Sequence, residues 1–136
     1  MRLLTFLSDG QPRLGALTND GASVVDLVSA FPERLDVRSM ADLLAAGPRA
    51  VRELAALLPA APQTSLLQLD GLRLGPPVRP SKICAIGLNY ADHAREQGVT
   101  PPDRPTLFAK YPTTIIGPGD EIRWDPALSS SIDYEA

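Results

Sequence analysis

The sequence predicts an α+β fold, with a small N-terminal α/β domain in residues 1–75 and the beginning of a β-rich region in residues 76–136. Two observations predict it. The first 75 residues combine short apolar runs, bounded by turn residues, with a stretch of helical periodicity. Nine of the fourteen prolines lie at or after Pro76. Because proline interrupts helices and central strands, the second half is expected to consist of short strands and loops.

The composition excludes two classes of partner. The 44% hydrophobic and 21% charged residues are typical of a soluble globular protein. The net charge is −3 and the arginines are scattered, so no basic surface for nucleic acid is expected. No apolar run reaches the ~20 residues of a membrane span, and the first apolar run is too short for a signal peptide. We therefore expect no membrane contact and a cytoplasmic location.

The N-terminal region begins with strands. Residues 2–7 and 13–17 are predicted strands joined around Asp9 and Gly10, and a turn at residues 19–21 leads into a third strand at residues 22–25. The pattern predicts an antiparallel sheet.

The period then changes to that of a helix. Ser39 is a plausible N-cap for residues 40–46, with Gly47 as the stop. Pro48 suits the first turn of a second helix, residues 49–58, whose apolar stripe we interpret as core packing.

The remaining elements are short. A strand is expected at residues 66–69, and a domain boundary near residue 75. Residues 80–87 predict a buried strand that contains Cys84 as a buried thiol, followed by a tight turn into a helix that ends at Gly98. A strand at residues 107–110 and a turn at residues 117–120 leading into an extended segment, residues 121–124, complete the pattern.

The only histidine of the chain, His93, lies on this second-half helix three residues before Glu96. Three residues is almost one helical turn, so both side chains project from the same face. A carboxylate orients an imidazole and strengthens it as a base, which suits the pair to take a proton from water. The alternative is a solvated surface pair without a catalytic role.

Six short motifs of the second half form an ordered series. They are Pro80-Ser81-Lys82-Ile83, Gly87-Leu88-Asn89-Tyr90, His93 with Glu96, Phe108-Ala109-Lys110, Gly117-Pro118-Gly119-Asp120 and Asp133-Tyr134-Glu135-Ala136. Together they resemble the fumarylacetoacetate hydrolase family, from Pro76 to the last residue. Residues 1–75 resemble the small N-terminal domain of many bacterial members. The resemblance implies that residues 76–136 begin a catalytic domain of the family's type, a mixed β-roll around a divalent metal ion.

The resemblance also implies roles for single residues. His93 and Glu96 would form a water-activating dyad on a lid-like helix, and Glu135 would be the first carboxylate of a Glu-x-Glu pair that binds Mg²⁺ or Mn²⁺. On a strand, residues i and i+2 face the same way, so two such carboxylates can hold one hard cation. Because the sequence ends at Ala136, where the second glutamate would follow, we expect a chain that lacks most of the metal site and is inactive alone.

Three further residues are candidates for substrate binding. Lys110 is either a cation for a substrate carboxylate or a strand-end lysine in solvent. Asn89 and Tyr90 either orient the helix and contact substrate or serve in capping and packing.

The resemblance predicts that the parent protein is a metal-dependent hydrolase of 2,4-dioxo acids, such as an acylpyruvate or fumarylpyruvate, that cleaves a carbon–carbon bond. A 2-oxo acid decarboxylase, isomerase or hydratase of aromatic catabolism is one alternative, and a non-catalytic fragment or interaction module is another. The expected partners are a small 2-oxo acid and, as in many family members, a second copy in a homodimer.

Overall fold

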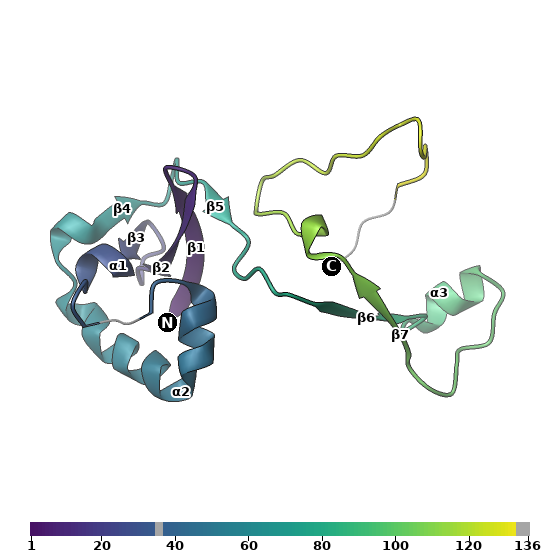
Figure 1. Cartoon of the computed structure of the whole chain (residues 1–136), viewed down its shortest axis with the longest axis horizontal. Helices are drawn as coiled ribbons and strands as arrows, with labels where there is room; N and C mark the ends of the chain where they lie inside the picture. The colour runs from purple at the N-terminus through teal and green to yellow at the C-terminus, as the bar shows by residue number, and fades with distance from the viewer. Residues whose placement is uncertain (35–36, 133–136) are drawn as a thin grey trace. The chain divides into compact units, whose positions relative to one another are not determined.

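The computed structural model of the chain describes residues 1–34 and 37–132. Its contacts divide the chain into two compact units (Figure 1). One unit, the N-terminal unit, contains Met1–Pro77 together with the segment that starts at Ile116. The other, the ribbon unit, contains Val78–Ile115. The α+β class is confirmed, with antiparallel strand pairing in both sheets. The domain boundary near residue 75 stays a prediction.

A five-stranded antiparallel sheet forms the base of the N-terminal unit. Its strands are β1 (Arg2–Ser8), β2 (Gln11–Leu17), β3 (Ser23–Asp26), β4 (Leu66–Gln68) and β5 (Leu74–Gly75), in the spatial order β4-β3-β2-β1-β5. The first four strands were expected from the sequence. Asp9 and Gly10 both have positive φ, 50° and 76°, which is the conformation of the tight turn that matches the twist of an antiparallel hairpin.

Two helices follow β3. The short helix α1 (Leu27–Ala30) begins at Asp26, whose carboxylate accepts a hydrogen bond from the Ser29 amide. Helix α2 (Met40–Leu57) begins at Ser39, as predicted, with a capping box in which Ser39 and Asp42 each accept a hydrogen bond from the other's backbone amide. Gly47, with φ of 79°, kinks α2, so the predicted break between two helical segments is confirmed.

The main core lies between one face of the sheet and these helices. Side chains from β2 and β3 pack against α1 and α2, and nine of these residues are buried: Leu14, Ala16, Val25, Leu27, Ala30, Phe31, Val37, Leu43 and Leu54. Leu43 and Leu54 lie on either side of the Gly47 kink and are fully buried. The apolar stripe of α2 is therefore core, as expected.

The opposite face of the sheet has its own close packing. Leu4, Phe6 and Val24 meet over Gly15, where an added Cβ would lie only 2.6 Å from Val24 Cγ1. The glycine thus leaves the space that the three larger side chains fill. On the same strand, Arg13 binds the Asp26 carboxylate at 2.7 Å and the Ser29 hydroxyl at 2.9 Å, which links β2 to the start of α1.

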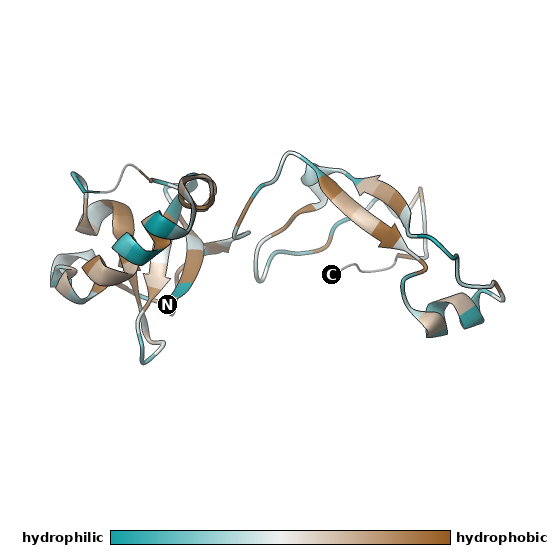
Figure 2. Ribbon diagram, turned by 90° about the horizontal axis from the view of Figure 1, so that it is seen from below, coloured by the Kyte–Doolittle hydropathy of each residue, from teal (hydrophilic) through white to brown (hydrophobic). Residues whose placement is uncertain are grey.

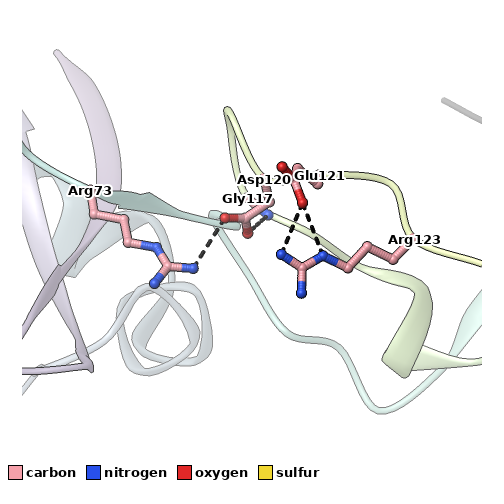
Figure 3. Close-up of polar contacts among 5 residues, drawn as sticks. All are labelled: Arg73, Gly117, Asp120, Glu121 and Arg123. Atoms are coloured by element: carbon pink, nitrogen blue, oxygen red, sulfur yellow. Dashed lines mark hydrogen bonds and ion pairs between the residues drawn. The ribbon is translucent and has the colours of Figure 1, made fainter.

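The segment after Ile116 packs against β5. The turn of residues 117–120, which the sequence predicted, closes with the Asp120 amide donating to the Gly117 carbonyl at 3.1 Å. The Asp120 carboxylate accepts from the Gly117 amide at 2.9 Å and from Arg73 at 3.2 Å (Figure 3). An added Cβ on Gly117 would lie 2.7 Å from the Leu74 carbonyl oxygen. Only glycine can approach β5 this closely.

Beyond this turn, the expected extended segment at residues 121–124 forms no strand among the described residues. A local pair in which Arg123 donates to Glu121 at 2.9 Å occupies this stretch instead (Figure 3). A short strand needs a partner ladder to persist, and no described strand pairs with these residues.

The ribbon unit consists of two strands and one helix. Strand β6 (Ile83–Gly87) pairs antiparallel with β7 (Thr106–Lys110), and helix α3 (Ala91–Glu96) lies between them in sequence. The strands and the helix were expected, but the burial of β6 was not predicted correctly. Cys84 is exposed, because a two-stranded ribbon has no described layer to cover its faces.

Apolar side chains on both strands are open to solvent. Ile86 is 49% exposed, and Leu107 and Phe108 are 68% and 42% exposed. The paired arrows of β6 and β7 appear largely brown, that is, hydrophobic, in Figure 2. In the part of the chain that the structure describes, no helix is long and apolar enough to cross a membrane.

Candidate functional site

The candidate site is built on α3, which a tight turn joins to β6. Gly87 ends the strand, and Leu88 adopts φ of 52° before the helix starts after Tyr90. A left-handed conformation is unfavourable for a residue with a Cβ, by about 1–2 kcal/mol. Such outliers concentrate where a fold must aim a functional element. The sequence predicts the turn but not the strained residue, because a leucine gives no signal for positive φ.

The C-terminal end of α3 is fixed by backbone hydrogen bonds. The Val99 amide donates to the Ala94 carbonyl and the Gly98 amide to the Arg95 carbonyl, both at 3.0 Å, while Gly98 has φ of 67°. This pair of bonds with a left-handed glycine is the Schellman motif. It confirms the predicted stop at Gly98 and places Gln97 at the helix C-cap.

His93 lies on the exposed side of α3, and its nearest polar partner is Gln97. The Nε2 atoms of the two side chains are 2.7 Å apart, a contact across one helical turn. Glu96 is also exposed, and within the described residues no hydrogen bond or ion pair joins its carboxylate to the His93 imidazole. The catalytic roles of His93 and Glu96 stay predictions. Gln97 was missed, because Glu96 and Gln97 are both helix neighbours of His93 and spacing alone does not choose between them.

Asn89 and Tyr90 precede the helix and are exposed. Tyr90 occupies the N-cap position but makes no capping hydrogen bond with its side chain, which is 71% exposed. Neither capping nor packing therefore accounts for the tyrosine in this structure. Its proposed contact with substrate stays a prediction.

Lys110 lies at the other end of the ribbon. The register pairs Gly87 with Thr106 at the end that leads to α3, and Ile83 with Lys110 at the opposite end. Four residues of strand separate the two ends, about 13 Å at ~3.3 Å per residue. The Lys110 ammonium lies 5.5 Å from the centroid of the Phe108 ring, which faces the same side of the strand. The structure thus groups His93, Glu96, Asn89 and Tyr90 at one end and places Lys110 apart from them.

The described residues contain no group of three or more histidine, cysteine or acidic side chains that could hold a metal ion. Glu135, the predicted metal ligand, lies outside the described residues. The metal requirement therefore stays a prediction carried by Glu135.

A groove of about 510 Å³ lies along α2 near its kink. Its lining is apolar except for Arg52, and Leu43 and Val51 are among the side chains that form it. No converging set of polar groups is present there, so the groove offers no chemistry comparable to that of α3.

Comparison with known proteins shows what the chain resembles. Residues 82–136 match the family described as fumarylacetoacetate (FAA) hydrolase C-terminal. Among curated proteins, a mitochondrial oxaloacetate tautomerase of Bos taurus is 36% identical over 99% of this chain, and one of Xenopus laevis is 37% identical over all of it. This chain spans 42% of the length of either relative.

Solved structures give the same result. A Mycobacterium smegmatis protein described as HpcE superposes with a TM-score of 0.66 at 30% identity, covering 92% of this chain and 41% of that one. A fumarylacetoacetate hydrolase from Exiguobacterium antarcticum, 24% identical, has a TM-score of 0.62 over 96% of this chain and 42% of its own, and supports the fold alone. The predicted resemblance to the fumarylacetoacetate hydrolase family is therefore confirmed by the match of residues 82–136.

Proposed function

We propose that the protein to which this chain contributes acts on a 2-oxo acid and that His93 is its general base. The observation that carries the proposal is the placement of the only histidine on the exposed face of α3, a helix held by a strained turn at one end and a Schellman motif at the other. The match of residues 82–136 to the family supports it.

Tautomerisation is the first candidate reaction. Relatives that align with 99% or more of this chain carry the name oxaloacetate tautomerase. In a keto–enol exchange, a base removes a proton from the carbon next to the 2-oxo group, the electron pair forms a carbon–carbon double bond, and the oxo oxygen gains a proton. An imidazole suits this step because it gains and loses a proton near neutral pH.

Hydrolysis of a 2,4-dioxo acid, the reaction predicted from the sequence, is the second candidate. Here His93 would take a proton from water, whose oxygen attacks the carbonyl distal to the 2-oxo acid group. The carbon–carbon bond then breaks, and the leaving fragment departs as an enolate that is protonated to a 2-oxo acid. The match of residues 82–136 to the family described as fumarylacetoacetate (FAA) hydrolase C-terminal supports this candidate. Decarboxylation and hydration stay predictions.

Lys110 is proposed to bind the carboxylate of the substrate. Its ammonium would hold one end of a 2-oxo acid while His93 works at the adjacent carbon. Because about 13 Å of strand separates the two ends of the ribbon, we expect α3 to lie back along the strands when both residues contact one substrate. The predicted lid-like role of α3 is consistent with this expectation.

The experiment compares His93→Ala with Arg95→Ala in the full-length protein. Arg95 is exposed on the same helix, so its replacement controls for changes to α3 itself. We expect His93→Ala to lower kcat at least about 100-fold, the usual contribution of a general base, and Arg95→Ala to leave it within about twofold. Oxaloacetate enol and an acylpyruvate are both offered as substrates. Unchanged turnover of both by His93→Ala would remove the base assignment.

The same activity assay tests two further predictions. Replacement of Glu135 with alanine is expected to raise the Mg²⁺ or Mn²⁺ concentration needed for half-maximal activity. The 136-residue chain alone is expected to be inactive; turnover by it would contradict that prediction. A homodimer and a cytoplasmic location stay predictions, and the relatives named above are called mitochondrial.

A further inference from the structure

The side chain that contacts His93 is the Gln97 amide, to which neither the sequence motifs nor the family match assigns a role. We propose that Gln97 is a positioning residue: its amide holds Nε2 of His93 and leaves Nδ1 as the nitrogen that takes the proton. The inference rests on the proposed role of His93 as the base.

The geometry distinguishes Gln97 from Glu96. Glu96 is three residues from His93 and Gln97 four, so both are neighbours on the helix surface. Only Gln97 is in contact, with the two Nε2 atoms 2.7 Å apart. Its backbone is held at the C-cap, where its own amide bonds to the His93 carbonyl at 3.2 Å and Gly98 closes the Schellman motif. The Gln97 backbone is therefore held in place one helical turn after His93, toward the C-terminal end of α3.

The chemistry of the contact allows two arrangements. An amide nitrogen only donates, so Gln97 either donates to a bare Nε2 or, after a half-turn of the amide, accepts the Nε2 proton with its oxygen. Among the described residues, no other hydrogen bond of the Gln97 side chain fixes the orientation of the amide.

The role of His93 as a base decides between the two. A neutral imidazole that receives a hydrogen bond at Nε2 carries its proton on Nδ1, so neither nitrogen is free to act as a base. If Nε2–H donates to the Gln97 oxygen, Nδ1 keeps its lone pair. When Nδ1 then gains a proton, the imidazolium still donates from Nε2 to the same oxygen. The contact with Gln97 therefore persists through proton transfer, and the ring does not need to turn.

Nitrogen NMR of the His93 imidazole in the full-length protein tests this directly, with its ring signals identified by their loss in His93→Ala. Gln97→Met removes the acceptor at similar length, and Gln97→Glu retains an acceptor. We expect the Nε2–H tautomer to prevail in the native chain and in Gln97→Glu, and its ratio to the Nδ1–H tautomer to fall about twofold in Gln97→Met. Twofold is the strength of a polar side-chain pair one turn apart in water.

The matched control is Glu96→Gln, which should leave the tautomer ratio as it is. The proposal is overturned if Gln97→Met leaves the ratio unchanged or if Glu96→Gln shifts it more than Gln97→Met does. It is also overturned if the Nδ1–H tautomer prevails in the native chain and Gln97→Glu shifts the ratio toward Nε2–H. That last result would mean that the amide donates.

Kinetics of the full-length protein complete the test. Gln97→Met should lower kcat by about two- to tenfold, the range of one ordinary hydrogen bond, with KM unchanged, and Gln97→Glu should retain more of kcat. A shifted tautomer ratio with unchanged kcat would overturn the positioning role. The tautomer measurement needs no substrate, so a failure of the proposed function would not be mistaken for a failure of the Gln97 contact.

Discussion

Replacing Gly117 with alanine is expected to detach the segment after Ile116 from β5 without unfolding the sheet. The new Cβ would lie 2.7 Å from the Leu74 carbonyl oxygen, which is 0.7 Å inside the 3.4 Å of an ordinary contact, and 3.2 Å from the Gly75 backbone. Backbone atoms cannot rotate away as side chains do, so an overpacking cost of about 1–3 kcal/mol applies. One contact that favours the docked position, between Arg73 and Asp120 at 3.2 Å, involves an Arg73 side chain that is 71% exposed and contributes about 0.2–1 kcal/mol.

Because the steric overlap costs more free energy than this contact contributes, we expect the segment to move away from β5 rather than strain the sheet. Hydrogen exchange followed by mass spectrometry should show faster exchange of the amides of residues 117–120 and nearly unchanged exchange in β1 and β2. The melting temperature should fall by no more than a few degrees. Gly119→Ala is the matched control, because Gly119 has φ of 79° and open space around it, so alanine there strains the turn without meeting β5. Equal exchange in both variants, or native exchange in Gly117→Ala, would refute the close approach.

Four further substitutions test the N-terminal unit. Leu54→Ala should lower the free energy of unfolding by about 2–5 kcal/mol in denaturant titration, since Leu54 is fully buried. Leu44→Ala, at a side chain 61% exposed, should change it by less than ~0.5 kcal/mol, and a similar loss in both would contradict the core assignment. Ser39→Ala should cost about 1 kcal/mol through the lost helix cap. Hydrogen bonds from Ser39 and the Arg38 amide lower the pKa of Asp42 below 3.8. This carboxylate therefore stabilises α2 above pH 3.8, and its contribution to the free energy of unfolding is lost as the pH falls further. Asp42→Asn should make the free energy of unfolding depend less on pH in that acid range.

Local chemistry explains which elements of the N-terminal unit could be predicted. The turn at Asp9 and Gly10 and the cap at Ser39 are decided by residues next to them in sequence, and both are confirmed. Strand β5 could not be predicted in the same way. It contains only Leu74 and Gly75, and it exists because these pair with Phe6 and Thr5 of β1, nearly seventy residues earlier. A two-residue strand has no period of its own to detect.

The burial of strand β6 in the ribbon unit was predicted wrongly from the sequence. An apolar run predicts a buried strand only if another layer covers it, and the sequence of β6 does not state what that layer is. Cys84 and Ile86 are exposed because both faces of the ribbon lack a described cover. The positions of the strands were predictable, since short apolar runs and the turn residues that bound them are local, while their environment depends on distant residues.

For the candidate site, too, the positions of the residues could be predicted from the sequence but their contacts could not. His93 and Glu96 were placed correctly on one helix, but the helix spacing alone could not show that Gln97 holds the imidazole. The Schellman motif fixes the C-terminal end of helix α3. Between Gly87 and the helix, Leu88 adopts an unfavourable φ. If α3 moves to bring His93 and Lys110 to one substrate, we expect the turn at Leu88 to change conformation. Leu88→Gly, which removes the conformational preference of that hinge, should change the KM for the 2-oxo acid more than Arg95→Ala does, and equal KM values in the two variants would argue against closure at this turn.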